Sequence, residues 1–227
     1  MNAEEEQGRH GSPWRVTVLF LLYGVVHSLL ASTIAKRKFI QVAGERARNG
    51  LYRPLYNAQA VAGLAAGTWA FLRLPDRLLY AVPRPWSWLL HVIQGGGITL
   101  LVRALKTTGL DQITGLGPLW AFVTGKPVQP ESEAQGPPPV SLRRPQKQGP
   151  YAWVRHPENL AMLALIWGIP RMTVNRLTLA LWTTLYAVIG SWHEDTRLQE
   201  AYGTAFARYR RTTPMLLPRL VRPRQGR

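Results

Sequence analysis

Long blocks without a charged side chain alternate with short polar segments along this sequence. Three of the blocks are long, with 20 residues over 16–35, 19 over 54–72 and 18 over 85–102. A helix that crosses a membrane needs roughly 20 mostly apolar residues, with about 17 as the lower limit. The pattern therefore predicts three transmembrane helices in the first half of the chain, within a region that spans residues 16–105.

Two shorter uncharged blocks follow at residues 159–170 and 177–192, joined by a polar segment at 171–176. Each block is marginal as a span, but together they predict a helical hairpin that turns near Asn175. A soluble all-α protein with buried helices is the alternative. Several of the nine tryptophans lie near block ends, which is typical of side chains that anchor a helix at the membrane interface. We therefore predict an all-α, polytopic membrane protein with about five transmembrane helices, the last two forming the hairpin.

The segments outside these blocks divide the rest of the chain. A polar N-terminal tail covers residues 1–15, a Pro- and Gly-rich connection covers 106–148, and a basic tail covers 219–227. Within the connection, residues 126–148 have too few apolar side chains to bury a core, which predicts a mobile linker or lid. Residues 149–218 hold the hairpin and a C-terminal amphipathic helix, which ends before Pro214 and either lies on the membrane surface or caps the hairpin. The residues that predict this helix recur at helical spacing: Leu198, Tyr202, Phe206 and Tyr209.

Charge and composition narrow the possible partners and the topology. The 28 Lys and Arg against 12 Asp and Glu give a net charge of +16, and the chain has no cysteine. The cations are interrupted by apolar blocks and form no aromatic–basic module, which favours contact with membrane lipids and no nucleic acid. With the N-terminus outside, 21 of the 28 cations face the cytoplasm, so the positive-inside rule predicts an external N-terminus and a cytoplasmic C-terminus. The absence of cysteine excludes disulfides, thiolate metal sites and a cysteine nucleophile.

The densest group of polar residues lies at the two ends of the predicted hairpin. Residues 156 and 194 are each 19 positions from the turn, so Arg155 and His156 should face Glu194 and Asp195. Pro157 suits the first turn of a helix, and the free N–H groups there, beside Arg155, would bind a carboxylate. The two acidic side chains would bind an ammonium group. This arrangement predicts a site for an amino-acid moiety, and a purely structural ion-pair collar is the alternative.

A family resemblance rests on the same residues. The motif Gly-Pro-Tyr-x-x-Val-Arg-His-Pro starts at Gly149, and Glu-Asp-x-x-Leu-x-x-x-Tyr-Gly-x-x-Phe-x-x-Tyr starts at Glu194. With the hairpin between them, these motifs resemble the isoprenylcysteine carboxyl methyltransferase superfamily of integral-membrane enzymes that use S-adenosylmethionine. The first-span segment His27-Ser28-Leu29-Leu30-Ala31 and the hairpin turn look like the bacterial branch that contains methanethiol S-methyltransferases and NnrU-like proteins.

The resemblance implies a function, a location and a set of site residues. The function is methyl transfer from S-adenosylmethionine to a small or lipophilic acceptor, either a thiol or a carboxylate, in a bacterial inner membrane. The alternatives are a non-catalytic, NnrU-like accessory or scaffold protein of the same fold and, less favoured, a nicotinamide-dependent reductase. His156 and Glu194 would be catalytic, with His156 or His193 as the base. Asn159 departs from the family, which often has Tyr there. The implied cofactor-binding residues are Tyr151, Val154, Arg155, His156, Pro157, Asn159, Glu194 and Asp195.

Other polar or small residues within and beside the spans have simpler interpretations. His27 and His91 lie inside predicted spans, where each should hydrogen-bond a neighbouring helix or line the substrate cavity. The Gly95–Gly97 run favours close helix packing. Asp111 is an acidic candidate near the inner interface or a solvated charge. We predict no metal site, because there is no cysteine and the histidines have no paired spacing.

Overall fold

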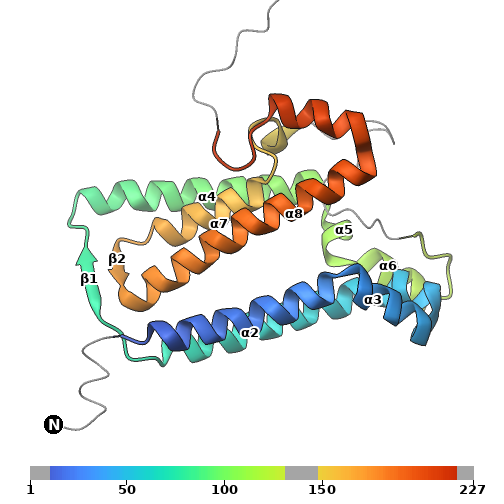
Figure 1. Ribbon diagram of the computed structural model, residues 1–227, viewed down its shortest axis with the longest axis horizontal. Coiled ribbons are helices and arrows are strands. Elements are labelled where there is room, and N and C mark those ends of the chain that lie inside the picture. Colours follow the sequence, from blue (N-terminus) through green and yellow to red (C-terminus); the bar gives the residue numbers. More distant parts are fainter. Residues whose placement is uncertain (1–10, 131–147, 219–227) are drawn as a thin grey trace, which may run out of the picture. The chain divides into compact units, whose positions relative to one another are not determined.

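The structure is a computed structural model, and it describes residues 11–130 and 148–218 (Figure 1). The described chain is mainly helical, as predicted, with one two-stranded antiparallel sheet. The basic tail, residues 1–10 of the N-terminal tail and residues 131–147 of the predicted linker lie outside the described residues. The elements are α2 (Pro13–Ala31), α3 (Thr33–Leu72), β1 (Leu78–Ala81), α4 (Trp86–Thr108), α5 (Leu110–Thr114), α6 (Leu116–Val123), η1 (Gly149–Ala152), α7 (Pro157–Trp167), β2 (Arg171–Thr173) and α8 (Val174–Thr212).

The chain divides into two compact units, and the first contains α2, α3, α5, α6 and the sheet. Helices α2 and α3 lie side by side (Figure 1). His27 shares a 2.7 Å hydrogen bond with the Tyr56 hydroxyl across this pair, which confirms the expected contact with a neighbouring helix. Asn57 of α3 donates to the carbonyl oxygens of Ile113 and Thr114 at 2.7 and 3.1 Å, and thereby holds α5 against α3. Helices α5 and α6 lie inside the predicted connection, where the sequence analysis predicted no helix, although residues 112–125 carry no charged side chain.

Asn175 fastens the turn of the predicted hairpin within the first unit. Its backbone N–H donates to Asp76 at 3.0 Å, its amide nitrogen donates to the Pro75 carbonyl at 3.0 Å, and its amide oxygen accepts from the Ser12 N–H at 2.7 Å. Just before it, β2 pairs with β1 through Leu78↔Thr173 and Ala81↔Arg171. The buried side-chain amide with two partners, together with the bonded backbone N–H, explains why the chain reverses here. The predicted position of the turn is confirmed.

The second unit contains α4, η1, α7 and the greater part of α8, and its helices approach closely at one glycine. A Cβ atom at Gly97 would lie 3.1 Å from both the Ala161 carbonyl oxygen and the Ala164 Cβ, a tight contact, so the glycine favours the close approach of α4 to α7. The predicted role in helix packing is confirmed for Gly97. Gly95 and Gly96 have no such neighbour within 4 Å.

Helices α7 and α8 form the predicted hairpin, tied by side-chain hydrogen bonds at two levels. Asn159 donates to the Ser191 hydroxyl at 2.8 Å, and Trp167 donates to the Thr184 hydroxyl at 3.0 Å. The 11 residues of α7 rise only about 16 Å, roughly half of the hydrocarbon thickness of a bilayer.

Two helices among the described residues, α2 and α4, are long and apolar enough to cross a membrane. Only 6% and 11% of their apolar windows are buried, so these side chains face outwards and do not form the core of a soluble protein. The second predicted span lies in α3, which contains Pro54 and breaks at Gly44. The count of five transmembrane helices stays a prediction.

The end of α8 differs from the expected separate amphipathic helix. Helix α8 continues without a break from the hairpin to Gly203, where φ is 52° and ψ is −125°, and then changes direction. Glycine is needed for this conformation because side chains at other L-residues clash there. The break at Gly203 separates Leu198 and Tyr202 from Phe206 and Tyr209, although the sequence placed all four on one helix face. Phe206 and Tyr209, which follow the break, are buried. The helix ends at Thr212, which confirms the predicted end before Pro214.

Candidate active site

The site is built where the start of α7 meets the end of α8. The short helix η1 leads into residues 153–156, and α7 begins at Pro157, whose missing N–H is not needed in a first turn. The backbone N–H groups of Arg155 and His156 donate to the carbonyls of Pro214 and Met215 at 2.9 and 3.2 Å. The chain after α8 therefore runs beside the chain before α7. Of the two predicted places for the C-terminal helix, this contact favours the cap on the hairpin.

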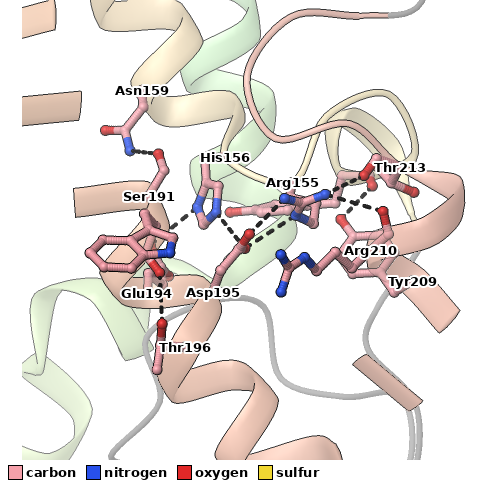
Figure 2. A network of polar contacts seen from close by, with 12 residues as sticks. Arg155, His156, Asn159, Ser191, Glu194, Asp195, Thr196, Tyr209, Arg210 and Thr213 are labelled. Atoms are coloured by element: carbon pink, nitrogen blue, oxygen red, sulfur yellow. Dashed lines mark hydrogen bonds and ion pairs between the residues drawn. The ribbon is translucent and has the colours of Figure 1, made fainter. Parts of the chain in front are cut away.

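Arg155 ties the two ends together through a buried ion pair (Figure 2). Its Nε and Nη2 atoms donate to the two Asp195 oxygens at 3.1 and 2.6 Å. Its Nη1 atom donates to the carbonyls of Thr213 and Arg210 at 2.5 and 3.3 Å. These contacts use four of the five guanidinium N–H groups. Arg155 thus holds the end of α8 in place, a role that differs from the predicted binding of a ligand carboxylate.

His156 lies between the two acidic residues of α8. Its Nε2 atom is 2.9 Å from Asp195 Oδ1, and its Nδ1 atom is 3.2 Å from Glu194 Oε2. Burial lowers the pKa of His156, but the hydrogen bonds and charges of the two carboxylates outweigh it and raise the pKa to about 9. The ring is therefore an imidazolium at neutral pH, with both nitrogens occupied. These contacts favour an orienting role, and the predicted role as a base stays a prediction.

The two acidic residues differ in how far a ligand can reach them. Asp195 is buried, and its bonds to His156 and Arg155 outweigh burial and lower the pKa of its carboxyl. The side chain of Glu194 is 25% exposed, against 3% for that of His156. Glu194 is therefore the member of the cluster that a ligand can contact. His193, the other candidate base, is exposed.

A second group of polar contacts adjoins this cluster and involves Glu158, which the sequence analysis did not select. The Tyr151 hydroxyl donates a short hydrogen bond to Glu158 Oε1, and it lies 2.9 Å from the Thr108 hydroxyl of α4. Tyr209 donates to the Tyr151 carbonyl at 2.7 Å. Burial raises the pKa of Glu158, and burial together with Glu158 raises the pKa of Tyr151. The available signal was an acidic residue directly after Arg-His-Pro.

The remaining predicted site residues lie beside the ion-pair cluster and are buried or hydrogen-bonded within the hairpin. Val154 and Pro157 are fully buried, so they shape the turn into α7. Asn159 is committed to Ser191, and it strengthens the hairpin at the level of the site (Figure 2). Contacts of Tyr151, Val154, Pro157 and Asn159 with a cofactor stay predictions. Within the described ranges, no group of three His, Asp or Glu side chains is arranged to hold a metal ion.

Comparisons with known proteins match these motifs. Residues 139–205 match the family model described as phospholipid methyltransferase. Methanethiol S-methyltransferase 2 of Bradyrhizobium diazoefficiens is 28% identical over 211 residues, which cover 92% of this chain and 74% of that protein. Methanethiol S-methyltransferase of Pseudomonas deceptionensis is 40% identical over 72 residues, 32% of this chain and 28% of that protein. Nurim of Rattus norvegicus is 28% identical over 185 residues, 74% of this chain and 61% of that protein. No solved structure matches the chain.

With the Arg-His-Pro and Glu-Asp motifs in contact across the hairpin, these matches define the class. The chain is similar to the membrane methyltransferases of the isoprenylcysteine carboxyl methyltransferase superfamily. Within that superfamily its relatives include methanethiol S-methyltransferases of bacteria, as the resemblance implies. Both parts of the resemblance seen in the sequence are confirmed.

Proposed function

We propose that the protein transfers a methyl group from S-adenosylmethionine to a small or lipophilic acceptor. A thiol is the preferred acceptor, and a carboxylate is the second choice. One observation carries the proposal. In a buried cluster whose other members hold one another, Glu194 alone keeps a carboxylate within reach of a ligand. The cluster lies at the two motifs that the chain shares with methyltransferases.

The site offers a partner for the ammonium group of the methyl donor in Glu194. Arg155, which was expected to help bind the carboxylate of the donor, already has other partners. One Glu194 oxygen contacts His156, and the other can accept from an ammonium group. Arg155 is committed to Asp195 and two backbone carbonyls. Helix α7 starts without a capping side chain at His156. The N–H group of Glu158 bonds its own carboxylate, so the first-turn N–H group of Asn159 beside it is the donor for the ligand carboxylate. When bound, the donor supplies an electrophilic methyl group on a sulfonium.

The chain's contribution to the rate is alignment. Displacement at a methyl group needs the attacking atom, the carbon and the leaving sulfur in line, and good orientation supplies up to about 7–11 kcal/mol. His156 holds Glu194 from one side, and Asp195 with Arg155 holds His156 from the other. Because each of these groups is fixed by charged hydrogen bonds, Glu194 presents its free oxygen in a defined direction.

The same proposal includes a topology. With an external N-terminus, the site lies on the cytoplasmic side, where S-adenosylmethionine is available and where most cations of the chain fall. Helices α2 and α4 present apolar faces to lipid, which suits an acceptor that enters from the bilayer.

Calorimetric titration of the detergent-purified protein with S-adenosylmethionine and S-adenosylhomocysteine tests the proposal. We expect micromolar binding that Glu194→Gln weakens by about 10- to 100-fold, since a hydrogen bond to a charged group contributes about 1.5–3 kcal/mol. Glu200→Gln is the matched control, because Glu200 is exposed on the same helix. Equal affinities for wild type and Glu194→Gln contradict the assignment of the site. Absence of binding in folded protein supports the NnrU-like accessory alternative.

A further inference from the structure

A chain of three hydrogen-bonded side chains lies next to the ion-pair cluster and has no part in the function proposed above. Thr108 of α4 contacts the Tyr151 hydroxyl at 2.9 Å, and that hydroxyl donates to Glu158 in the first turn of α7. Tyr209 holds Tyr151 from the other side through its backbone carbonyl. Tyr151 is buried, whereas Glu158 is partly exposed. These contacts therefore fix the Glu158 carboxylate beside the ion-pair cluster, at a residue that is not fully buried.

Glu158 differs from the other two acidic residues in what it contacts. Asp195 accepts hydrogen bonds from Arg155 and His156, and Glu194 contacts His156, so cations hold both. Glu158 accepts from a phenol hydroxyl. A carboxylate bonded to a neutral donor keeps more of its basicity than one in an ion pair.

The charges that surround Glu158 come from each element packed against it. His156 precedes it on the same turn, Glu194 faces it from α8, and the Glu158 charge also acts on Tyr209. Helix α4 contributes the uncharged hydroxyl of Thr108 through Tyr151. Burial and the Glu194 charge raise the pKa of Glu158, while its hydrogen bonds and His156 lower it, and the net direction is upwards. The charge of Glu194 raises the pKa of Glu158, so the two carboxylates are electrostatically coupled. Glu158 therefore lies near Glu194, the residue that we propose binds the methyl donor.

We propose that Glu158 is the base that removes the proton from an acceptor thiol, and that Tyr151 is the positioning residue that holds its carboxylate. The proposal rests on the methyltransferase function above and names the proton acceptor of that same site. His156 is poorly suited to this role because both of its ring nitrogens face carboxylates.

The proposed step balances in atoms and electrons. The thiol S–H bond breaks, and its proton goes to Glu158. The sulfur then uses the freed electron pair to bond to the methyl carbon. The carbon–sulfonium bond breaks, and its electron pair stays with the leaving sulfur, which becomes a neutral thioether. Glu158 afterwards releases the proton to water, so no further reactant is needed.

The first experiment measures methyl transfer to methanethiol by Glu158→Gln between pH 6 and 9, with Glu200→Gln as the control. General-base catalysis typically contributes 10²- to 10⁴-fold, so we expect a loss of about 100-fold or more in kcat near pH 7. In the variant, kcat/KM should rise about tenfold per pH unit, because only thiolate from solution reacts. With an aromatic thiol that is already ionised at pH 8, we expect a loss below about fivefold. Unchanged kcat and pH profile in Glu158→Gln would overturn the proposal.

The second experiment does not depend on turnover. Isotope-edited infrared spectroscopy of the unliganded protein should show a carboxylic acid band that titrates above the usual range for Glu and disappears in Glu158→Gln. Tyr151→Phe should move that titration to higher pH, because it removes a hydrogen bond that lowers the pKa of Glu158. Absence of such a band in the wild type, or no shift of the band in Tyr151→Phe, would count against the proposal.

The two proposals fail in different ways. Wild-type protein that is folded, binds no S-adenosylmethionine and methylates no thiol refutes both. Wild-type protein that methylates thiols, with Glu158→Gln retaining the wild-type rate and pH profile, refutes the base and leaves the methyltransferase function standing. Retained donor binding in Glu158→Gln, together with lost turnover, supports both.

Discussion

Replacement of Asp195 by Asn is the sharpest test of how the site is held together. The Asp195 carboxylate accepts three hydrogen bonds, from Arg155 Nε at 3.1 Å, Arg155 Nη2 at 2.6 Å and His156 Nε2 at 2.9 Å. In Asp195→Asn the geometry is nearly kept, but the charge is lost, and the amide NH₂ faces a donor. Arg155 and His156 are then buried without the Asp195 charge, and Glu194 remains as a partner of His156 alone.

The size of the effect follows from burial. The side chains of Arg155 and Asp195 are 7% and 5% exposed, so solvent screens their attraction little. Removing one partner of a buried pair typically costs about 3–5 kcal/mol, because the other charge is left unpaired. For a domain of this length, that loss corresponds to roughly 6–20 °C in melting temperature. Arg155 also holds the carbonyls at the end of α8, so residues 204–216 should lose protection from hydrogen exchange before the helical hairpin does.

The assay is thermal unfolding in detergent, followed by tryptophan fluorescence, with Glu200→Gln as an exposed control on the same helix. Combining Asp195→Asn with Arg155→Met should cost less than the sum of the single changes, since the unpaired guanidinium is then absent. A loss below about 1 kcal/mol for Asp195→Asn would refute the reasoning, because an ion pair of that strength is characteristic of solvent-exposed positions.

Three further predictions follow from single residues. The pKa of His156 is raised to about 9 from its usual 6.5, so its charged form stabilises the fold by about 3 kcal/mol. This stability should be complete below pH 6.5 and lost as pH rises through 9. Melting curves of His156→Gln should lack this loss, and an equal dependence of melting temperature on pH in both proteins would contradict the prediction. Gly203→Ala should cost about 1–3 kcal/mol, because φ at this break is positive, and wild-type stability would argue against the conformation. Gly168→Ala would place a Cβ 2.6 Å from the Ala164 carbonyl oxygen and should cost about 1–3 kcal/mol in the same melts. The control Gly190→Ala meets nothing within 4 Å inside α8 and should raise the stability by up to about 1 kcal/mol; equal melting temperatures for the two variants would refute the close contact.

The meeting of the two motifs could be predicted from the sequence, because two uncharged blocks of similar length flank a polar turn. An antiparallel hairpin with its turn at Asn175 places Glu194 opposite His156 by counting alone, and the structure brings the two within 3.2 Å. Close packing at the Gly95–Gly97 run and the contact of His27 with a neighbouring helix were also predictable, but which of the three glycines makes the contact was not.

What each site residue contacts could not be predicted in the same way. Charge pattern shows that Arg155 needs anionic partners, but it does not show that the carbonyls of Arg210 and Thr213 occupy part of its guanidinium. Those contacts depend on the reversal at Gly203, and a glycine inside a helical pattern gives no direction of bending. Glu158 was overlooked because its partner, Tyr151, comes from another turn of the chain and adds no charge.

The central claim, methyl transfer by this chain, is tested most directly with S-adenosylmethionine that carries a ¹³C-labelled methyl group. Purified protein in lipid vesicles, supplied with labelled donor and methanethiol, should release dimethyl sulfide with one labelled carbon, at a rate that Glu194→Gln reduces and Glu200→Gln does not. Labelled product formed equally by wild type and Glu194→Gln would contradict the site. Folded wild-type protein that forms no labelled product with thiol or carboxylate acceptors would contradict the function itself.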